Sequence, residues 1–149
     1  MKQITKYCWL VGLASLVAGC ASGPKYSELH STFPALSSEQ GRIFVYRARA
    51  FGGSAVQPEV KLDGARVGSS KPGGFFYIDR PPGQYELSTT TEVKRSLSLT
   101  LDKGQTRFVR LKIAMGFWVG HVYPELVEPD KGEKEIQKCS FVGDKPCTP

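Results

Sequence analysis

The sequence has few of the residues that catalytic sites use most. Its 149 residues include two histidines, His30 and His121, and its serines form no Gly-x-Ser-x-Gly motif. A hydrolytic triad needs a nucleophile, a base and an orienting acid, and no residue is marked as a nucleophile for His121. A half-buried imidazole bonded to backbone is therefore preferred to a catalytic base. We predict no catalytic residues and no enzymatic activity, and a hydrolase ranks last among the alternatives.

The chain also lacks an apolar run long enough to cross a membrane. The longest such run, Tyr7 to Ala18, has an apolar core of about ten residues, whereas a spanning helix needs about 20. Because Lys2 and Lys6 precede this run and small residues end it, it is typical of an export signal. The final segment, Leu16 to Cys20, resembles the bacterial lipobox. The alternative is an ordinary signal peptide followed by a coincidental cysteine.

The lipobox resemblance implies a lipid anchor at Cys20. In that family of signals the cysteine sulfur receives a diacylglyceryl group, and the mature chain begins at the modified cysteine. Stable anchoring needs more than one acyl chain, since each buried methylene contributes about 0.8 kcal/mol. The next residue is Ala21 and not aspartate, which implies sorting to the outer membrane. We expect the protein on the inner leaflet of that membrane, facing the periplasm.

Cysteine is scarce, and its positions limit what it can do. Of the four cysteines, Cys8 leaves with the signal and Cys20 is used for lipid, so Cys139 and Cys147 remain. In an oxidising periplasm we predict a disulfide between them, with two free thiols as the alternative. Two cysteines without a nearby histidine or second cysteine pair are half of a zinc site. We predict no metal and no cofactor.

No strong charge of one sign is present. The chain has 20 basic and 14 acidic side chains, and Lys2 and Lys6 belong to the signal. This mild excess suits anionic headgroups or cell-wall polymers, but it lacks the concentrated basic stripe of nucleic-acid-binding proteins. We predict no nucleic-acid partner.

The composition divides the chain into three parts. Residues 1–19 are the signal. Residues 20–40 contain Pro24, Pro34 and five serines, which predict a flexible tether after the lipidated cysteine, although Phe33 and Leu36 have the option of packing on the domain. Residues 41–149 are long enough for one domain with a modest core.

Within residues 41–149 the hydrophobic period is two, which is typical of strands. The segment Arg42–Arg47 is apolar on both faces and suits a central strand. Alternation places Val60 and Leu62 inward, and similar patterns place the leucines of 96–101 and the apolar residues of 106–114 inward. We predict further strands over 66–67, 74–79 and 84–89, and consider one more over 117–122.

Turn residues and one helical segment complete the predicted domain. Asp63-Gly64 favours a tight hairpin, and Asp102 to Gly104 predicts a three-residue hairpin into the strand that begins at Thr106. Pro129 stands at a plausible first helical position, so a short helix is expected over 129–137. The predicted fold is all-β: a small antiparallel β-sandwich of about seven to eight strands with one short C-terminal helix.

Several of these segments resemble the Gram-negative lipoprotein family that carries domain of unknown function 2846. The resemblance rests on residues 41–47, 61–64, 67–68, 74–77, 82–83, 104–105 and 134–136, and it covers nearly the whole mature chain. The Asp-Gly and Pro-Gly spacing is also similar to PEGA-type surface domains, which are small β-sandwiches. The resemblance implies a fold and a location but brings no catalytic residues.

Binding is therefore the favoured class of function. Phe117 and Trp118 form an aromatic cluster in an expected loop, and Arg110 and Lys112 point outward and form part of a possible basic face with Lys61, Arg66 or Arg80. We expect a non-catalytic binding or scaffolding module whose partner is an unknown envelope protein or a cell-wall polymer. The alternative is an inhibitor of a secreted or host enzyme such as a lysozyme, acting through a loop around residues 51–54.

Overall fold

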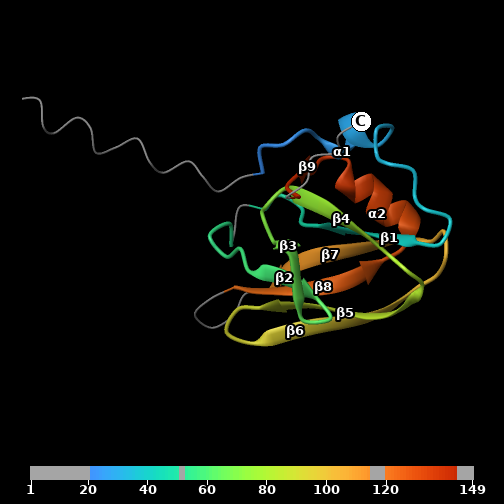
Figure 1. Cartoon of the computed structure of the whole chain (residues 1–149). Coiled ribbons are helices and arrows are strands. Elements are labelled where there is room, and N and C mark those ends of the chain that lie inside the picture. Colours follow the sequence, from blue (N-terminus) through green and yellow to red (C-terminus); the bar gives the residue numbers. More distant parts are fainter. Residues whose placement is uncertain (1–20, 51–52, 115–119, 144–149) are drawn as a thin grey trace, which may run out of the picture.

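The computed structural model describes residues 21–50, 53–114 and 120–143, and these residues form two sheets and two short helices (Figure 1). The strands are β1 (Gly41–Tyr46), β2 (Glu59–Leu62), β3 (Ala65–Ser69), β4 (Gly74–Arg80), β5 (Gly83–Thr90), β6 (Lys94–Leu101), β7 (Thr106–Ala114), β8 (His121–Val127) and β9 (Ser140–Phe141). The helices are α1 (Tyr26–Leu29) and α2 (Pro129–Ile136). The predicted sandwich-like all-β fold with a C-terminal helix is confirmed.

The two sheets have different sizes and mixed strand directions. The five-stranded sheet has the order β8-β7-β1-β4-β9, and the four-stranded sheet has the order β3-β2-β5-β6. Most pairs are antiparallel, as predicted, but β1 pairs with β7 in parallel and β4 pairs with β9 in parallel. The described strands number nine, because the short β9 adds to the strands that the sequence pattern indicates.

The main hydrophobic core lies between the sheets. The inward positions predicted from alternation are buried there, among them Val60, Leu62, Leu99 and Leu101. Strand β7 contributes Val109 and Leu111, and β4 contributes Phe76 and Ile78. A period of two therefore identified the correct inward face in each of these strands.

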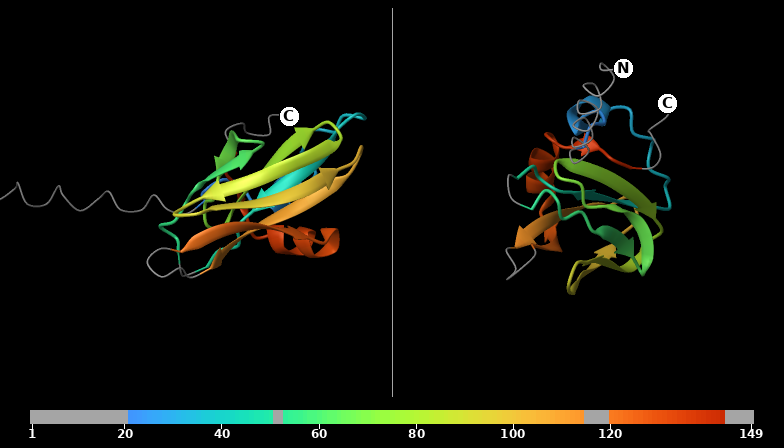
Figure 2. Two further views of the ribbon diagram at one scale, coloured as in Figure 1. Left: turned by 90° about the horizontal axis from the view of Figure 1, so that it is seen from below. Right: turned by 90° about the vertical axis from the view of Figure 1, so that its left-hand side faces the viewer.

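A second core covers the outer face of the five-stranded sheet. Phe44, Phe75 and Phe108 point to this face, and Tyr26 of α1 and Ile136 of α2 pack on them. Figure 2 shows both helices on one side of this sheet, with the four-stranded sheet on the other. Strand β1 is buried at all six positions because it is central and covered on both faces.

Helix α2 begins where the sequence places it. Pro129 occupies the first turn, as predicted, since its missing N–H needs no helical partner there. Gly132 is buried against Phe108, and a Cβ at this position would lie well inside van der Waals contact with the Phe108 side chain. Glycine therefore lets α2 approach β7 closely.

One predicted hairpin is present and another is wrong. Asp63 and Gly64 have φ angles of 49° and 83°, which closes the tight β2–β3 turn as expected. The turn at Asp102 to Gly104 instead carries the chain from the four-stranded sheet to the five-stranded sheet, where β7 pairs with β1 and β8. Local turn residues marked the reversal correctly but could not specify the partner strand.

Candidate functional site

The point where the chain enters the domain is the best-defined feature that bears on function. Ala21, the residue after the candidate lipidation cysteine, is 7% exposed, and its N–H donates to the Pro72 carbonyl at 3.4 Å. Lys25 forms an isolated bridge with Ser140, and the Tyr26 N–H donates to the Cys139 carbonyl at 2.9 Å. The described start of the chain is therefore attached to the β3–β4 loop and to β9.

Aromatic packing holds the same segment. The ring of Tyr26 lies 5.4 Å from the rings of Phe44 and Phe75 and 5.5 Å from that of Phe33. Residues 21–33 belong to the tether predicted from composition, but they contain side chains of the second core, and Phe33 packs on the domain. Since aromatic residues bury large apolar areas, this segment belongs to the folded unit.

The side chains of Arg110 and Lys112 lie on the outer face of the five-stranded sheet, but each has an acidic partner. Arg110 contacts Glu135 of α2 at 2.7 Å and Glu125 of β8 at 2.9 Å, and Lys112 contacts Glu125 at 2.8 Å. Hydrogen bonds from Lys112 and Arg110 lower the pKa of Glu125. The Tyr46 hydroxyl donates to Glu135 at 2.6 Å, and burial followed by this bond raises the pKa of Tyr46.

These contacts change the role expected of Arg110 and Lys112. Their charges are compensated by β8 and α2, so the two residues do not form an uncompensated basic face. Arg66 lies in the other sheet and pairs with Glu59 at 3.1 Å, and hence it cannot join them. The sequence pattern gave their outward direction correctly but not the acids that the fold brings opposite.

Several residues of the sequence-based predictions lie outside the described residues. These are Cys20, Cys147, Phe117 and Trp118, together with Phe51 of the loop assigned to the inhibitor alternative. Lipidation, the disulfide and the aromatic contact surface stay predictions.

Cys139 is described, and its thiol is free and buried. Its residue is 2% exposed, and the Sγ atom lies 3.7 Å from the Arg47 carbonyl oxygen. Burial, with a smaller contribution from Glu135, raises the pKa of the Cys139 thiol to about 11. The folded environment therefore favours the neutral thiol over the reactive thiolate.

His121 lies in a shallow hollow of about 400 Å³ that Ser96 also lines. Its Nδ1 atom is 3.2 Å from the Thr91 hydroxyl. The sequence predicts a hydrogen bond between this imidazole and the backbone, whereas the observed partner is a side-chain hydroxyl. The described lining of the hollow includes Arg95 and Tyr123 but no aspartate or glutamate. A triad would need such an acid to orient the base.

Two buried arginines were missed by sequence reasoning. Arg47 is 2% exposed and donates to the carbonyls of Gly53, Val56 and Ser70 at 2.6–2.7 Å. These hydrogen bonds connect the β1–β2 loop, which contains Gly53 and Val56, to the β3–β4 loop, which contains Ser70. The signal for it was available, because a charged residue at the end of an otherwise apolar strand needs buried partners.

Arg42 is the second. It forms a bidentate pair with Asp79, both bonds being 2.7 Å, and its guanidinium carbon lies 4.5 Å from the Tyr77 ring centroid. Tyr77 and Asp79 also line an open groove of about 510 Å³ between β3 and β4, together with Arg66 and Arg80. The Arg42–Asp79 ion pair and the Tyr77 ring therefore lie beside this groove at the edge of the sandwich. The spacing of these residues along the sequence does not indicate that they lie together.

The described part of the chain has neither a cluster of metal-ligating side chains nor a membrane-spanning helix. Across residues 21–50, 53–114 and 120–143, no three His, Cys, Asp or Glu side chains group as a metal site would require. Over the same ranges no helix is long and apolar enough to cross a bilayer.

Comparison with known proteins places this fold in a family. The family model described as "Protein of unknown function (DUF2846)" matches residues 37–122. The chain belongs to this family. The matched range runs from the segment before β1 to the start of β8 and so contains most of both sheets.

A relative in Haemophilus influenzae shares more of the chain. That protein, called an uncharacterized protein, is 30% identical over 146 residues, which cover 95% of this chain and 86% of the relative. The similarity thus extends beyond the family match on both of its sides. Neither comparison assigns an activity.

Proposed function

We propose that this protein is a lipid-anchored envelope lipoprotein that faces the periplasm and acts as a non-catalytic binding or scaffolding module. The Leu16–Cys20 lipobox resemblance gives the anchor, and Ala21 gives the sorting to the outer membrane. The observation that carries the proposal is the attachment of the following segment to the domain. A lipid on Cys20 would then hold the folded domain directly at the membrane surface.

The non-catalytic part of the proposal has separate support. The described partner of His121 is Thr91, and the hollow around His121 presents no carboxylate among its described lining residues. Arg42 and Arg110 form ion pairs with acidic side chains of the same fold, Arg42 with Asp79 and Arg110 with Glu125 and Glu135. These groups stabilise the fold, and a partner is expected to contact the domain surface instead.

Fatty-acid labelling of growing cells tests the anchor. Wild-type protein, Cys20→Ser and Cys8→Ser are expressed in a Gram-negative host that is fed a clickable fatty acid, and their membranes are separated by density. Cys8→Ser is the matched control, because it also removes a cysteine of the N-terminal region. We expect label and outer-membrane sedimentation for wild type and Cys8→Ser, and neither for Cys20→Ser.

Equal labelling of all three proteins, or no labelling of any, would overturn the anchor. Labelled protein in the inner membrane would contradict the sorting step alone. The module function is tested by crosslinking in the same cells: a reproducible crosslinked envelope protein or cell-wall fragment supports it, and a chain that stays uncrosslinked at every surface position speaks against it.

A further inference from the structure

Four basic residues surround the point where the chain enters the domain, and we call them the entry face: Lys25, Arg49, Lys71 and Lys138. Lys71 precedes Pro72, the acceptor of the Ala21 N–H. Lys25 bridges to Ser140, whose N–H donates to Gly73 at 2.8 Å. The backbone of residues 72–73 therefore links the chain entry to both lysines.

Arg49 adjoins the same backbone, and Lys138 lies two residues before Ser140, whose N–H donates to Gly73. The side chain of Arg49 lies beside Gly73, with its Nε atom 3.2 Å from the position that a Cβ of Gly73 would take. Lys138 precedes Cys139, whose carbonyl accepts from the Tyr26 N–H. The entry face is thus assembled from four separate segments of the chain, and the fold brings it together.

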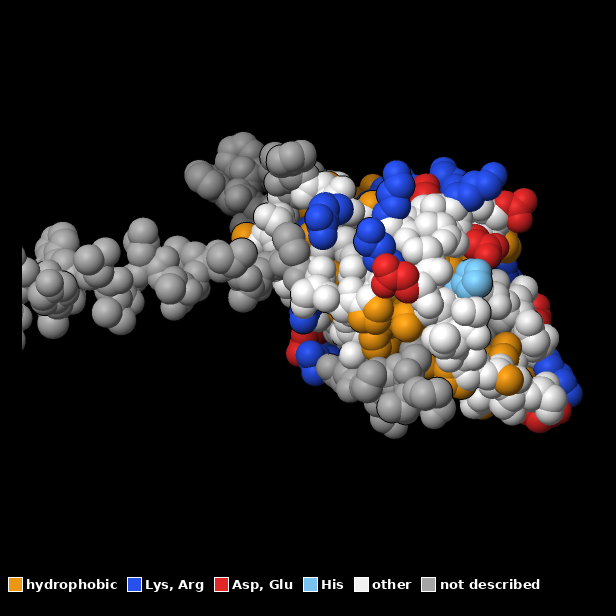
Figure 3. Space-filling view, turned by 90° about the horizontal axis from the view of Figure 1, so that it is seen from above, with side chains coloured by type: hydrophobic (Ala, Val, Ile, Leu, Met, Phe, Trp, Pro, Cys, Tyr) orange, Lys and Arg blue, Asp and Glu red, His pale blue; other side chains and the backbone are white. Residues whose placement is uncertain are grey.

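The charges of the entry face are exposed and uncompensated by ion pairs. All four residues are exposed, and within the described ranges none of the four side chains forms an ion pair. The nearby acid Glu28 accepts from the Lys25 backbone N–H, and Glu135 is held by Arg110. Figure 3 shows several Lys and Arg side chains on the face of the molecule seen from above, with Asp and Glu side chains among them.

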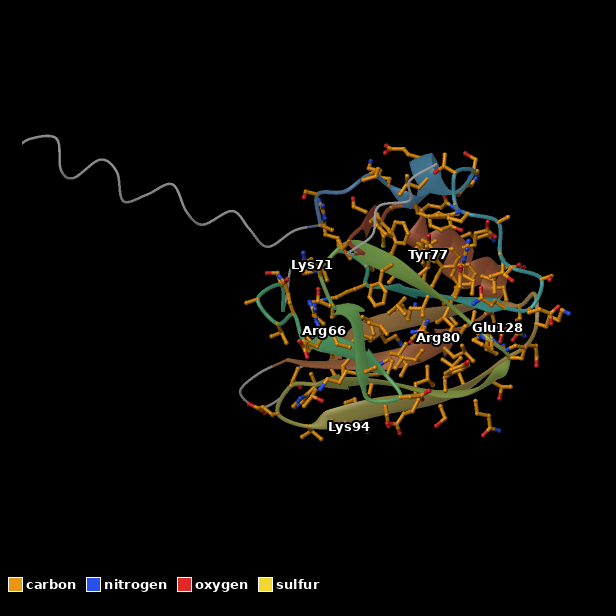
Figure 4. The ribbon with its side chains drawn as sticks, viewed as in Figure 1. Arg66, Lys71, Tyr77, Arg80, Lys94 and Glu128 are labelled. Carbon is orange, nitrogen blue, oxygen red and sulfur yellow. The ribbon has the colours of Figure 1, made fainter. Side chains whose placement is uncertain are left out.

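The opposite end of the molecule provides a comparison. Arg80 pairs in register with Gly41 at the start of β1, and Gly104, next to Lys103, donates its N–H to Gln40. Lys71 lies just before β4 and Arg80 ends this strand, and Figure 4 shows the two labelled residues apart from each other. Arg80 and Lys103, the second of which pairs with Glu39, are therefore basic residues at the far end of β1.

We propose that the entry face binds the anionic phospholipid headgroups of the leaflet that holds the anchor. The inference rests on the proposed lipidation of Cys20. Consecutive Cα atoms are about 3.8 Å apart, so a lipidated Cys20 lies one residue from a backbone fixed at Pro72. The entry face must then lie at the headgroup layer, and each basic residue near an anionic surface strengthens binding about fivefold.

Binding of the unlipidated protein to vesicles tests the entry face separately from the lipid anchor. The described helices and strands and the buried residues of both cores lie within residues 26–141, so the mature chain with Cys20→Ser is expected to retain the fold. This chain is mixed with vesicles of phosphatidylcholine alone or with phosphatidylglycerol added, and bound protein is measured by sedimentation at low salt. Lys25→Gln with Lys71→Gln is compared with the control pair Arg80→Gln with Lys103→Gln.

We expect binding to the anionic vesicles only, a roughly 25-fold loss for the entry-face pair and a small loss for the control pair. Equal losses for both pairs, or no binding to anionic vesicles, would overturn the entry face. Because no acyl chain is present, this outcome is independent of whether Cys20 is lipidated in cells. A circular dichroism spectrum confirms that each variant is folded.

Discussion

At the scale of single residues, Arg47 shows how a buried charge is satisfied without an acid. Its guanidinium donates to three loop carbonyls, and the dipoles of these carbonyls stabilise its positive charge. Burial lowers the pKa of Arg47, as expected for a charge removed from water. The residue therefore stabilises the loops on either side of the entry point.

Replacing Arg47 should be costly. Arg47→Met leaves the carbonyls of Gly53, Val56 and Ser70 without their donor, and we expect a loss of about 3 kcal/mol in the free energy of unfolding. Urea denaturation measures it, with exposed Arg95→Met as control at under about 0.5 kcal/mol. Similar values for both variants would show that the buried bonds contribute little.

Cys139 makes stability depend on alkaline pH. Its thiol ionises near pH 11 in the folded state but near pH 9 when exposed, so the unfolded state releases its proton first. The free energy of unfolding should therefore fall between pH 9 and 11, by about 2 kcal/mol. In reductant, this fall is expected for the wild type and should be smaller by that amount in Cys139→Ala.

The same titration tests the predicted disulfide. A bridge to Cys147 removes the thiol, so without reductant the wild type should follow the Cys139→Ala profile. If the wild type keeps its additional alkaline loss under oxidising conditions, the bridge does not form.

At the scale of elements, the sequence predicted most strands and the helix α2 but not the partners of every strand. Alternation at β2, β6 and β7 and the proline at α2 are local signals, and they appear where the sequence places them. The parallel pairing of β1 with β7 depends on contacts between distant residues, which no local pattern records. The short α1 was missed because four residues show no helical period.

Gly132 tests the contact between α2 and β7. Alanine is favoured over glycine inside a helix by about 1 kcal/mol, but its Cβ would collide with Phe108. We expect Gly132→Ala to lower stability by about 2 kcal/mol, because overpacking exceeds the gain in propensity. The exposed Lys134→Ala is the control, and a raised urea midpoint for Gly132→Ala would contradict the close approach.

Tyr26 tests whether the segment after the anchor belongs to the domain. Tyr26→Ala removes a buried ring from the second core and should cost about 3–5 kcal/mol in urea denaturation. Ser27→Ala, at the neighbouring exposed position, should change stability by less than about 0.5 kcal/mol. If both variants unfold at the wild-type midpoint, residues 21–33 are a dispensable tether.

At the scale of the whole molecule, the structure has three layers: helices, the five-stranded sheet and the four-stranded sheet. The sequence predicted the two sheets, but the third layer depends on aromatic residues such as Phe75, which lie on the outer surface of the five-stranded sheet. In the fold that surface is covered by α1 and α2. Cys20 stays a prediction from the sequence, whereas the entry face arises from segments that only the fold brings together.

With the proposed lipid anchor, this arrangement would give the molecule a defined orientation at the membrane. A domain fixed at Ala21 would present the β3–β4 loop to the membrane and the Gly41 end of β1 to the periplasm. The groove at Tyr77 and Arg80 would then lie along the side of the domain, where an envelope partner has access.

The intact mass of the protein extracted from membranes tests the central claim most directly. The proposal predicts a chain that begins at Cys20 and carries the added mass of a diacylglyceryl group and an amide-linked acyl chain. A chain that begins at another residue, or a Cys20 without added lipid, would contradict the anchor and with it the orientation of the domain.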